Sequence, residues 1–182
     1  PLQEAQYQLD VNVLGPVRLI QYVLPVFRRQ HHGRIVMVSS IAGRVTGPYG
    51  GWYHASKYAL EALSDALRME LKDMGIRVVL VEPGLVKTGW GMIAANHLEN
   101  ASKNSPNALP CAKVARGMRR LYQKKWLTSP KKVAQTIFLA ARSARPQSRY
   151  FIGLDAYLIF WAHALLPTEL FDTLARWVMR RL

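Results

Sequence analysis

Tyr53 and Lys57 are the pair of residues whose types and spacing could do chemistry. They are four residues apart, so in a helix both side chains lie on one face. A free tyrosine has a pKa near 10, and an ammonium about 4 Å away stabilises a phenolate by roughly 4 kcal/mol. Lys57 could therefore lower the pKa of the Tyr53 phenol and make it a general acid and base. The alternative for this spacing is an ordinary pair on a helix surface.

Two further polar residues could join this pair. Ser40 ends a short apolar segment before Tyr53, and its hydroxyl could hold a substrate oxygen toward the phenol; the alternative is a turn cap. Pro16 has no N–H, so a helix through it frees the carbonyl of Asn12. That carbonyl could hold an ordered water that relays protons to Lys57, or the segment could simply be kinked.

A turn rich in glycine and proline follows the second apolar segment. Pro83 and Gly84 come first, and Val86 and Thr88 follow. Glycine lets a ligand approach the backbone closely, and backbone N–H groups beside a hydroxyl suit an amide or a phosphate. The alternative is an ordinary turn that ends a strand.

The periodicity of apolar residues predicts the elements that must position these side chains. Short β-branched segments predict strands, and apolar residues at helical spacing predict helices. We expect strands over 34–38, 76–81 and 150–153, helices over 9–30, 53–74, 112–126 and 130–142, and helical structure broken at Pro167 over 155–182. Residues 89–112, rich in Asn, Ser and Pro, are expected to be irregular.

Strands alternating with helices predict an α/β fold with a parallel sheet. Ligands of such sheets bind beyond the carboxyl ends of the strands. In this sequence those ends are Ser39–Ser40 and Glu82–Gly84, which places the polar and glycine residues where a site is expected.

Four motifs, in this order and spacing, resemble the short-chain dehydrogenase/reductase family. The resemblance is firm over residues 1 to about 90. The Glu82-Pro83-Gly84 form and the long C-terminal extension are similar to the branch that holds 17β-hydroxysteroid and retinol dehydrogenases. The resemblance to the family rests on Asn12-Val13-x-Gly15, Gly33-Arg34-Ile35-Val36-x-Val38-Ser39-Ser40-x-Ala42-Gly43, Tyr53-x-Ala55-Ser56-Lys57-Tyr58-Ala59 and Val81-Glu82-Pro83-Gly84-x-Val86-x-Thr88.

The resemblance implies a role for each of these residues in an NAD(P)-dependent oxidoreductase. Tyr53 exchanges the proton with the substrate oxygen, Ser40 orients that oxygen, and Lys57 lowers the pKa of Tyr53 and binds the nicotinamide ribose. Asn12 holds the relay water. The nicotinamide end of the cofactor is lined by Pro83, Gly84, Val86 and Thr88.

The resemblance also implies a Rossmann-like, doubly wound parallel sheet of which the chain is only the C-terminal portion. The family's glycine-rich phosphate loop and the residues that select NAD or NADP precede Asn12, and the printed sequence contains neither. We therefore expect a fragment that lacks the first βαβ half, binds its cofactor poorly by itself, and does not reveal the choice between NAD and NADP.

We expect one domain over 1–182, with a catalytic core at 1–88, a substrate loop and helix at 89–129, and the last strand and C-terminal helices at 130–182. The family arrangement would make residues 89–112 a lid. Apolar residues that could lie over the site are Met92, Ile93, Leu98, Leu109 and, on the following helix, Trp126. These residues predict a small apolar alcohol, ketone or aldehyde as the substrate.

Charge and cysteine content bear on partners and location. The formal charge is +14, and residues 113–182 carry 14 of the 25 Lys and Arg against three acids. Such a surface is either simply solvated or meets an anionic partner, but no nucleic-acid recognition motif is present. One cysteine suits a reducing compartment, so we expect a cytoplasmic protein. The histidine spacing predicts no metal site.

The segment after Pro167 is amphipathic. Its apolar face predicts a lid or a dimer contact in a homo-oligomer, with contact to a membrane surface as the alternative. The main functional alternative is a non-catalytic scaffold that keeps the fold, although a scaffold has no need of Asn12, Ser40, Tyr53 and Lys57 together.

Overall fold

The computed structural model describes residues 1–181 and contains a three-stranded parallel sheet in the order β1-β2-β3. Strand β1 (Gly33–Val38) pairs with β2 (Ile76–Pro83), which pairs in turn with β3 (Arg149–Ile152). The register runs from Gly33 opposite Ile76 to Val38 opposite Val81. The expected α/β class with a parallel sheet is confirmed, and each predicted strand is found within two residues of its expected bounds.

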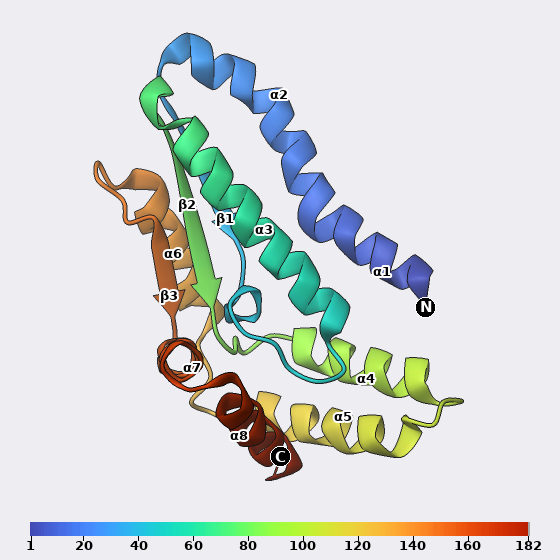
Figure 1. Ribbon diagram of the computed structural model, residues 1–182. Helices are drawn as coiled ribbons and strands as arrows, with labels where there is room; N and C mark the ends of the chain where they lie inside the picture. The colour runs from blue at the N-terminus through green and yellow to red at the C-terminus, as the bar shows by residue number, and fades with distance from the viewer. Residues whose placement is uncertain (182) are drawn as a thin grey trace.

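Helices follow and precede these strands in the alternation that the sequence predicts. Figure 1 shows their arrangement. Their bounds are α1 (Leu2–Leu9), α2 (Gly15–Gln30), α3 (Gly51–Glu70), α4 (Trp90–Ser102), α5 (Ala108–Tyr122), α6 (Pro130–Arg142), α7 (Leu154–Leu165) and α8 (Thr168–Arg181).

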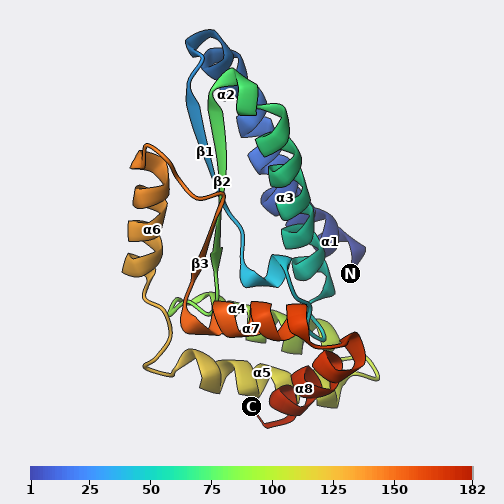
Figure 2. The same cartoon turned by 60° about the vertical axis from the view of Figure 1, so that its left-hand side comes forward.

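Alternating side chains of the strands build two apolar layers because successive residues of a strand point to opposite faces. Figure 2 shows α2 and α3 on one face of the sheet and α6 on the other. The first layer packs strand residues against α2 and α3 and consists of Ile20, Ile35, Met37, Leu60, Leu71, Ile76, Val78 and Leu80. The second packs the other face against α6 and contains Val79, Val81, Ala140 and Ile152.

The first helical region differs from the single expected helix. It begins at Leu2 and contains a π-helical turn, η1 (Asp10–Leu14), just before Pro16. Gly15 N–H donates to Asp10 O, five residues back, so the chain meets the missing N–H of Pro16 with a wider turn rather than a sharp kink. The turn carries Asn12 toward α3.

The expectation of irregular structure over 89–112 is wrong. The segment forms α4, a short connection, and the start of α5, which ends at Tyr122 rather than at Trp126. The two helices pack closely through small buried residues, among them Gly91, Ala95, Cys111 and Ala115. Tertiary packing therefore overrides the weak helix propensity of Asn and Ser in this segment.

Helices α4, α5, α7 and α8 lie together at the carboxyl ends of the strands, as Figures 1 and 2 show. A third apolar cluster joins α7 and α8 to the segment after β1 through Ile41, Val45, Ala156 and Phe171. The predicted break at Pro167 is confirmed, since α7 ends at Leu165 and α8 begins at Thr168. Leu182 lies outside the described residues. Within residues 1–181, every helix is too short or too polar to cross a membrane.

Candidate active site

Tyr53 and Ser40 meet at the carboxyl end of the sheet. Ser40 follows β1, and Tyr53 lies in the first turn of α3. Burial raises the pKa of the Tyr53 phenol above its usual value, and a hydrogen bond with Ser40 opposes this rise. Ser40 Oγ also accepts from Ala42 N at 3.1 Å and donates to Pro83 O at 3.3 Å. The serine therefore caps a turn, as one reading of its sequence position predicts, and it also contacts the phenol.

Lys57 approaches the same strand end. Its Nζ donates to Val38 O at 3.2 Å, two residues before Ser40. Burial lowers the pKa of Lys57, and the nearby Glu61 carboxylate opposes this change. The structure differs here from the sequence-based expectation, because the pKa of Tyr53 is raised and Lys57 is not among its causes. The ammonium bonds a carbonyl oxygen, and the phenol is governed by its burial.

Asn12 is linked to the site through Ser56. Asn12 Nδ2 donates to Ser56 Oγ at 3.0 Å, and Ser56 Oγ donates to Tyr53 O at 2.7 Å. Ser56 is fully buried on α3, where it meets Asn12 of η1. This link fixes the start of α3, whose first two turns carry Tyr53 and Lys57.

The segment after β2 is held by backbone bonds to other elements. Gly84 N donates to Ile152 O at 2.9 Å, and Lys87 N donates to Thr128 O at 2.8 Å. Val86 forms a parallel bridge with Thr128. Thr88 Oγ1 accepts from Trp90 N at 3.3 Å and so helps to begin α4. Residues 83–88 are therefore a fixed backbone ledge beside Ser40.

An aromatic wall that sequence analysis missed adjoins the phenol. The ring of Trp90 lies 5.1 Å from that of Tyr53, and the ring of Tyr122 lies 6.1 Å from that of Trp90, measured between centroids. Burial, together with the nearby Tyr53 and Asp155, raises the pKa of Tyr122 to about 12. The residues expected to cover the site were Met92, Ile93, Leu98, Leu109 and Trp126, but Trp90 contacts Tyr53. Trp90 follows Thr88 by two residues, which is the signal that could have identified it.

His54 orders the loop between Ser40 and α3. Gly47 N donates to His54 Nε2 at 3.1 Å, and His54 Nδ1 lies 3.0 Å from Ala42 O. A ring that accepts at Nε2 must carry its proton at Nδ1, so this arrangement needs the neutral imidazole. The loop that connects the serine to the tyrosine is thereby fixed from within α3.

A buried ionic cluster lies under the site and was also missed. Arg149 Nε lies 3.0 Å from Glu82 Oε1, and Arg149 Nη2 lies 2.6 Å from Asp65 Oδ2 and 3.2 Å from Glu61 Oε2. Glu82 is completely buried, and its burial followed by the charge of Glu61 raises its pKa to about 7. Glu61 follows Lys57 by one helical turn, and Glu82 precedes Pro83, so the cluster joins α3 to the ledge.

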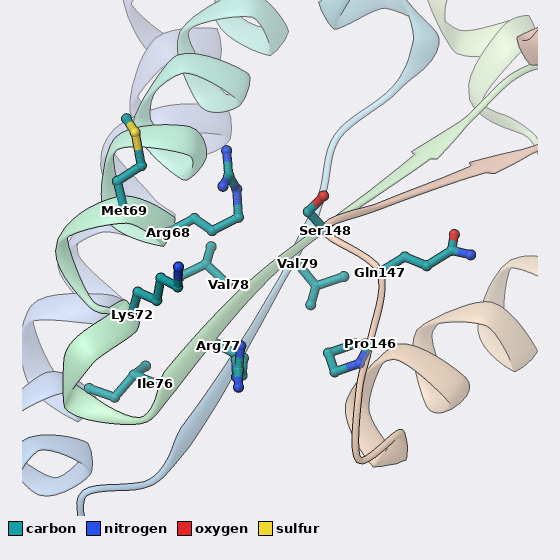
Figure 3. A pocket seen from close by; sticks show the side chains of 10 residues that line it. All are labelled: Arg68, Met69, Lys72, Ile76, Arg77, Val78, Val79, Pro146, Gln147 and Ser148. Atoms are coloured by element: carbon teal, nitrogen blue, oxygen red, sulfur yellow. The ribbon is translucent and has the colours of Figure 1, made fainter.

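Of two hollows in the fold, one adjoins the site and the other lies far from it, and neither is centred on Tyr53. One, of about 480 Å³, runs along the outer side of β1 and includes Asn12 and Lys57 among its lining residues. The other, of about 320 Å³, lies at the opposite end of β2 and is shown in Figure 3. It is lined by Arg68, Met69, Lys72, Ile76, Arg77, Val78, Val79, Pro146, Gln147 and Ser148. Residues 1–181 contain no cluster of His, Cys, Asp or Glu that could hold a metal ion.

A parallel α/β sheet thus carries a tyrosine, a serine and a lysine close to the carboxyl end of one strand. Residues 2–98 match the family described as short chain dehydrogenase. A probable short-chain type dehydrogenase/reductase, VdlC of Helicobacter pylori, is 38% identical over 98% of this chain and 65% of its own length. Human retinol dehydrogenase 16 is 36% identical over 93% of this chain and 56% of its own length. The chain therefore belongs to the short-chain dehydrogenase/reductase family.

Solved structures agree on the fold. A short-chain dehydrogenase from Streptomyces avermitilis superposes with a TM-score of 0.71 at 27% identity, over 97% of this chain and 61% of its own. A short-chain dehydrogenase from Burkholderia cenocepacia in complex with NADP gives a TM-score of 0.68 at 20% identity, over 96% and 60%. The chain thus spans about three-fifths of the length of the proteins it matches.

Proposed function

We propose that the protein is an NAD(P)-dependent oxidoreductase that interconverts an alcohol and a ketone or aldehyde on an apolar substrate. The observation that carries the proposal is the meeting of Tyr53 and Ser40 beside the ledge of residues 83–88, with Lys57 on the adjoining strand-end carbonyl. Three polar side chains from two separate elements converge there in a family whose members are oxidoreductases.

The chain's own residues supply the proton chemistry. In reduction, Tyr53 donates its phenolic proton to the substrate oxygen, and Ser40 holds that oxygen by a hydrogen bond. In oxidation, the Tyr53 phenolate accepts the alcohol proton. The nicotinamide cofactor, when bound, supplies or accepts the hydride. Lys57 has three N–H donors, of which Val38 O occupies one, so two remain for the hydroxyl groups of a ribose.

Side chains that can bind hydroxyl and amide groups favour the nicotinamide end of a cofactor here over its phosphates. We propose that Asn12, Tyr53 and Lys57 hold this end together with the ledge that contains Pro83, Gly84, Val86 and Thr88. The printed sequence contains no glycine-rich phosphate loop. Either NAD or NADP is consistent with this half of a site.

We further propose that this chain alone binds the cofactor weakly and that a preceding βαβ half completes the enzyme. Strand β1 lies at an edge of the sheet, and the apolar side chain of its last residue, Val38, is 44% exposed. A further strand or helix beside β1 could cover this side chain. Parallel sheets are normally covered on their faces and continue to further strands. Titration of NAD(P)H fluorescence with residues 1–182 tests this proposal, and tight binding would refute it.

The aromatic wall supports an apolar substrate. Trp90 lies against Tyr53, and Tyr122 backs Trp90, so a substrate oxygen that reaches the phenol brings its carbon skeleton against two rings. We propose a flat or extended apolar alcohol or carbonyl compound. A panel of steroid, retinoid, fatty-acyl and sugar-derived carbonyls, assayed with both cofactors, distinguishes these substrates.

The decisive experiment is Tyr53→Phe in the full-length protein. This change removes only the phenolic oxygen, so we expect turnover to fall at least about 100-fold with an unchanged circular dichroism spectrum. Tyr7→Phe, on an exposed face of α1, is the matched control and should leave turnover unchanged. Full turnover in Tyr53→Phe would contradict the proposed mechanism. Absence of turnover in the wild type with every substrate would favour a non-catalytic scaffold.

The outer face of α7 and α8 is proposed as the contact of a homo-oligomer. Large apolar residues recur there at helical spacing and remain exposed: Leu154, Tyr157, Leu158, Trp161, Leu165, Leu170, Leu174, Trp177 and Val178. Sedimentation velocity should show self-association that is lost on deleting residues 168–182. If the deletion instead removes binding to anionic vesicles and leaves the oligomeric state unchanged, the face contacts a membrane surface.

A further inference from the structure

Asp155 links helix α7 to the ledge beside the candidate active site. Its Oδ2 accepts a hydrogen bond from Leu85 N at 2.6 Å, across 70 residues of sequence. The neighbouring Gly84 N donates to Ile152 O, and Leu85 O accepts from Thr128 N at 3.1 Å. The peptide groups of Gly84 and Leu85 are thus held by β3, by α7 and by the segment before α6, and Asp155 is the side chain in this set.

Two glycines make room for this carboxylate. A Cβ atom added at Gly84 would overlap Asp155 Oδ2, and one added at Gly153 would overlap Asp155 Oδ1. The three heavy atoms nearest to the added Cβ at Gly84 all belong to the Asp155 carboxyl group. Gly153 also has φ +101°, a backbone conformation that favours glycine. The carboxylate therefore fills a space that the backbone on both sides leaves open for it.

Asp155 lies in the first turn of α7, where the helix dipole stabilises negative charge. An ionised carboxylate only accepts hydrogen bonds, and its bond to a backbone N–H is stronger than one between neutral groups. Leu85 N–H is therefore directed toward α7, which fixes the orientation of the Gly84–Leu85 peptide.

The same short segment touches the proton-transfer residues on its other side. Ser40 Oγ donates to Pro83 O, two residues before Leu85, and Ser40 contacts Tyr53. The charge of Asp155 also contributes to the raised pKa of Tyr122. The ring of Tyr122 lies next to that of Trp90, which lies next to that of Tyr53. Residues 83–85 thus lie between the acid/base group and the first turn of α7, with one polar contact on each side.

We propose that Asp155 is a positioning residue that holds the Pro83–Leu85 backbone in the conformation in which it receives the nicotinamide end of the cofactor. This inference rests on the proposed function. It adds that helix α7 acts on cofactor binding through one carboxylate. Displacement of α7 would release the ledge and weaken cofactor binding while Tyr53 and Ser40 keep their places.

The first test needs no activity. Asp155→Ala should increase the amide hydrogen exchange of Leu85 at least about tenfold, and Asp155→Asn, whose amide oxygen can still accept, should have a smaller effect. Gly84→Ala should lower the melting temperature strongly in the wild type and less in an Asp155→Ala background, because the overlapping atoms are then gone. Equal effects of Gly84→Ala in both backgrounds, or unchanged Leu85 exchange, would overturn the proposed contact.

The second test uses steady-state kinetics of the full-length protein with a substrate identified by the panel above. Asp155→Ala should raise the KM for NAD(P)H about tenfold with a smaller change in kcat, and Asp155→Asn should recover part of the loss. Asp172→Ala removes an exposed acid of α8 and should leave both constants unchanged. A lower melting temperature with an unchanged cofactor KM would reduce Asp155 to a helix cap and refute positioning. If Tyr53→Phe is fully active, the proposed mechanism is wrong. The hydrogen-exchange and melting data test the contact between Asp155 and Leu85 independently of that result.

Discussion

Asn12 donates a hydrogen bond to the buried hydroxyl of Ser56, which donates in turn to the backbone carbonyl of Tyr53. The two residues are 44 positions apart, on η1 and α3, and their bond ties the π-helical turn to the turn that carries the phenol. The π-helical turn beside Pro16 is thus the feature that brings Asn12 within reach of α3.

This link predicts non-additive effects on stability. Ser56→Ala removes two hydrogen bonds in a fully buried place and should cost about 1–3 kcal/mol of unfolding free energy. Adding Asn12→Ala should then cost less than it does in the wild type, by about 0.5–1 kcal/mol, because its partner is already lost. Denaturant unfolding of the four proteins gives this coupling.

Ser64→Ala is the control for that cycle. Ser64 is buried on the same helix, but its hydroxyl donates only to Leu60 O of α3 itself, at 2.7 Å. Its cost should therefore add to that of Asn12→Ala. Equal coupling of Asn12 to Ser56 and to Ser64 would contradict a specific link between η1 and the first turn of α3.

The raised pKa of Tyr53 predicts how the phenol titrates without cofactor. Burial disfavours the phenolate, so the difference in absorbance at 295 nm between wild type and Tyr53→Phe should rise only above pH 10. At pH 7 the phenol is then protonated and ready to donate in reduction, whereas oxidation must quicken as pH rises. A titration midpoint clearly below 10 in the isolated chain would contradict this expectation and restore the direct effect of Lys57.

Glu82 predicts a pH-dependent stability. Its pKa is about 7 in the fold against a usual value of 4.5, so the native state binds a proton that the unfolded state releases. The protonated Glu82 therefore stabilises the fold fully below pH 4.5, and this stabilisation is lost as pH rises through about 7. The loss in unfolding free energy is roughly 1–3 kcal/mol. Glu82→Gln cannot titrate, so its stability relative to wild type should improve over this range. A constant difference between the two proteins from pH 4.5 to 7.5 would show that Glu82 is ionised throughout.

The contact between α4 and α5 predicts opposite outcomes for two nearby glycines. A Cβ added at Gly91 would overlap the ring of Tyr122, whereas one at Gly89 would meet nothing within 4 Å. Gly91→Ala should lower the melting temperature by several degrees and weaken substrate binding, because Tyr122 backs Trp90. Gly89→Ala should change neither property. Similar melting temperatures for the two variants would show that the ring of Tyr122 does not pack against Gly91.

The sequence by itself determined the fold class and the strand ends. Short β-branched segments and the stops at Ser39–Ser40 and Pro83–Gly84 have purely local causes, namely side-chain shape, the rigid φ of proline and the freedom of glycine. The four-residue spacing of Tyr53 and Lys57 likewise suffices to put both on one helix face. Because these causes act between neighbours in the chain, they can be recognised without the tertiary structure.

Only the tertiary structure decided what each polar group contacts. The helices over 89–112 form because small residues of α4 and α5 pack together, and that packing depends on residues far apart in sequence. The bonds of Asn12 to Ser56 and of Leu85 to Asp155 join distant elements in the same way. The pKa of Tyr53 rises because the assembled fold removes water from the phenol, and residue spacing carries no measure of burial.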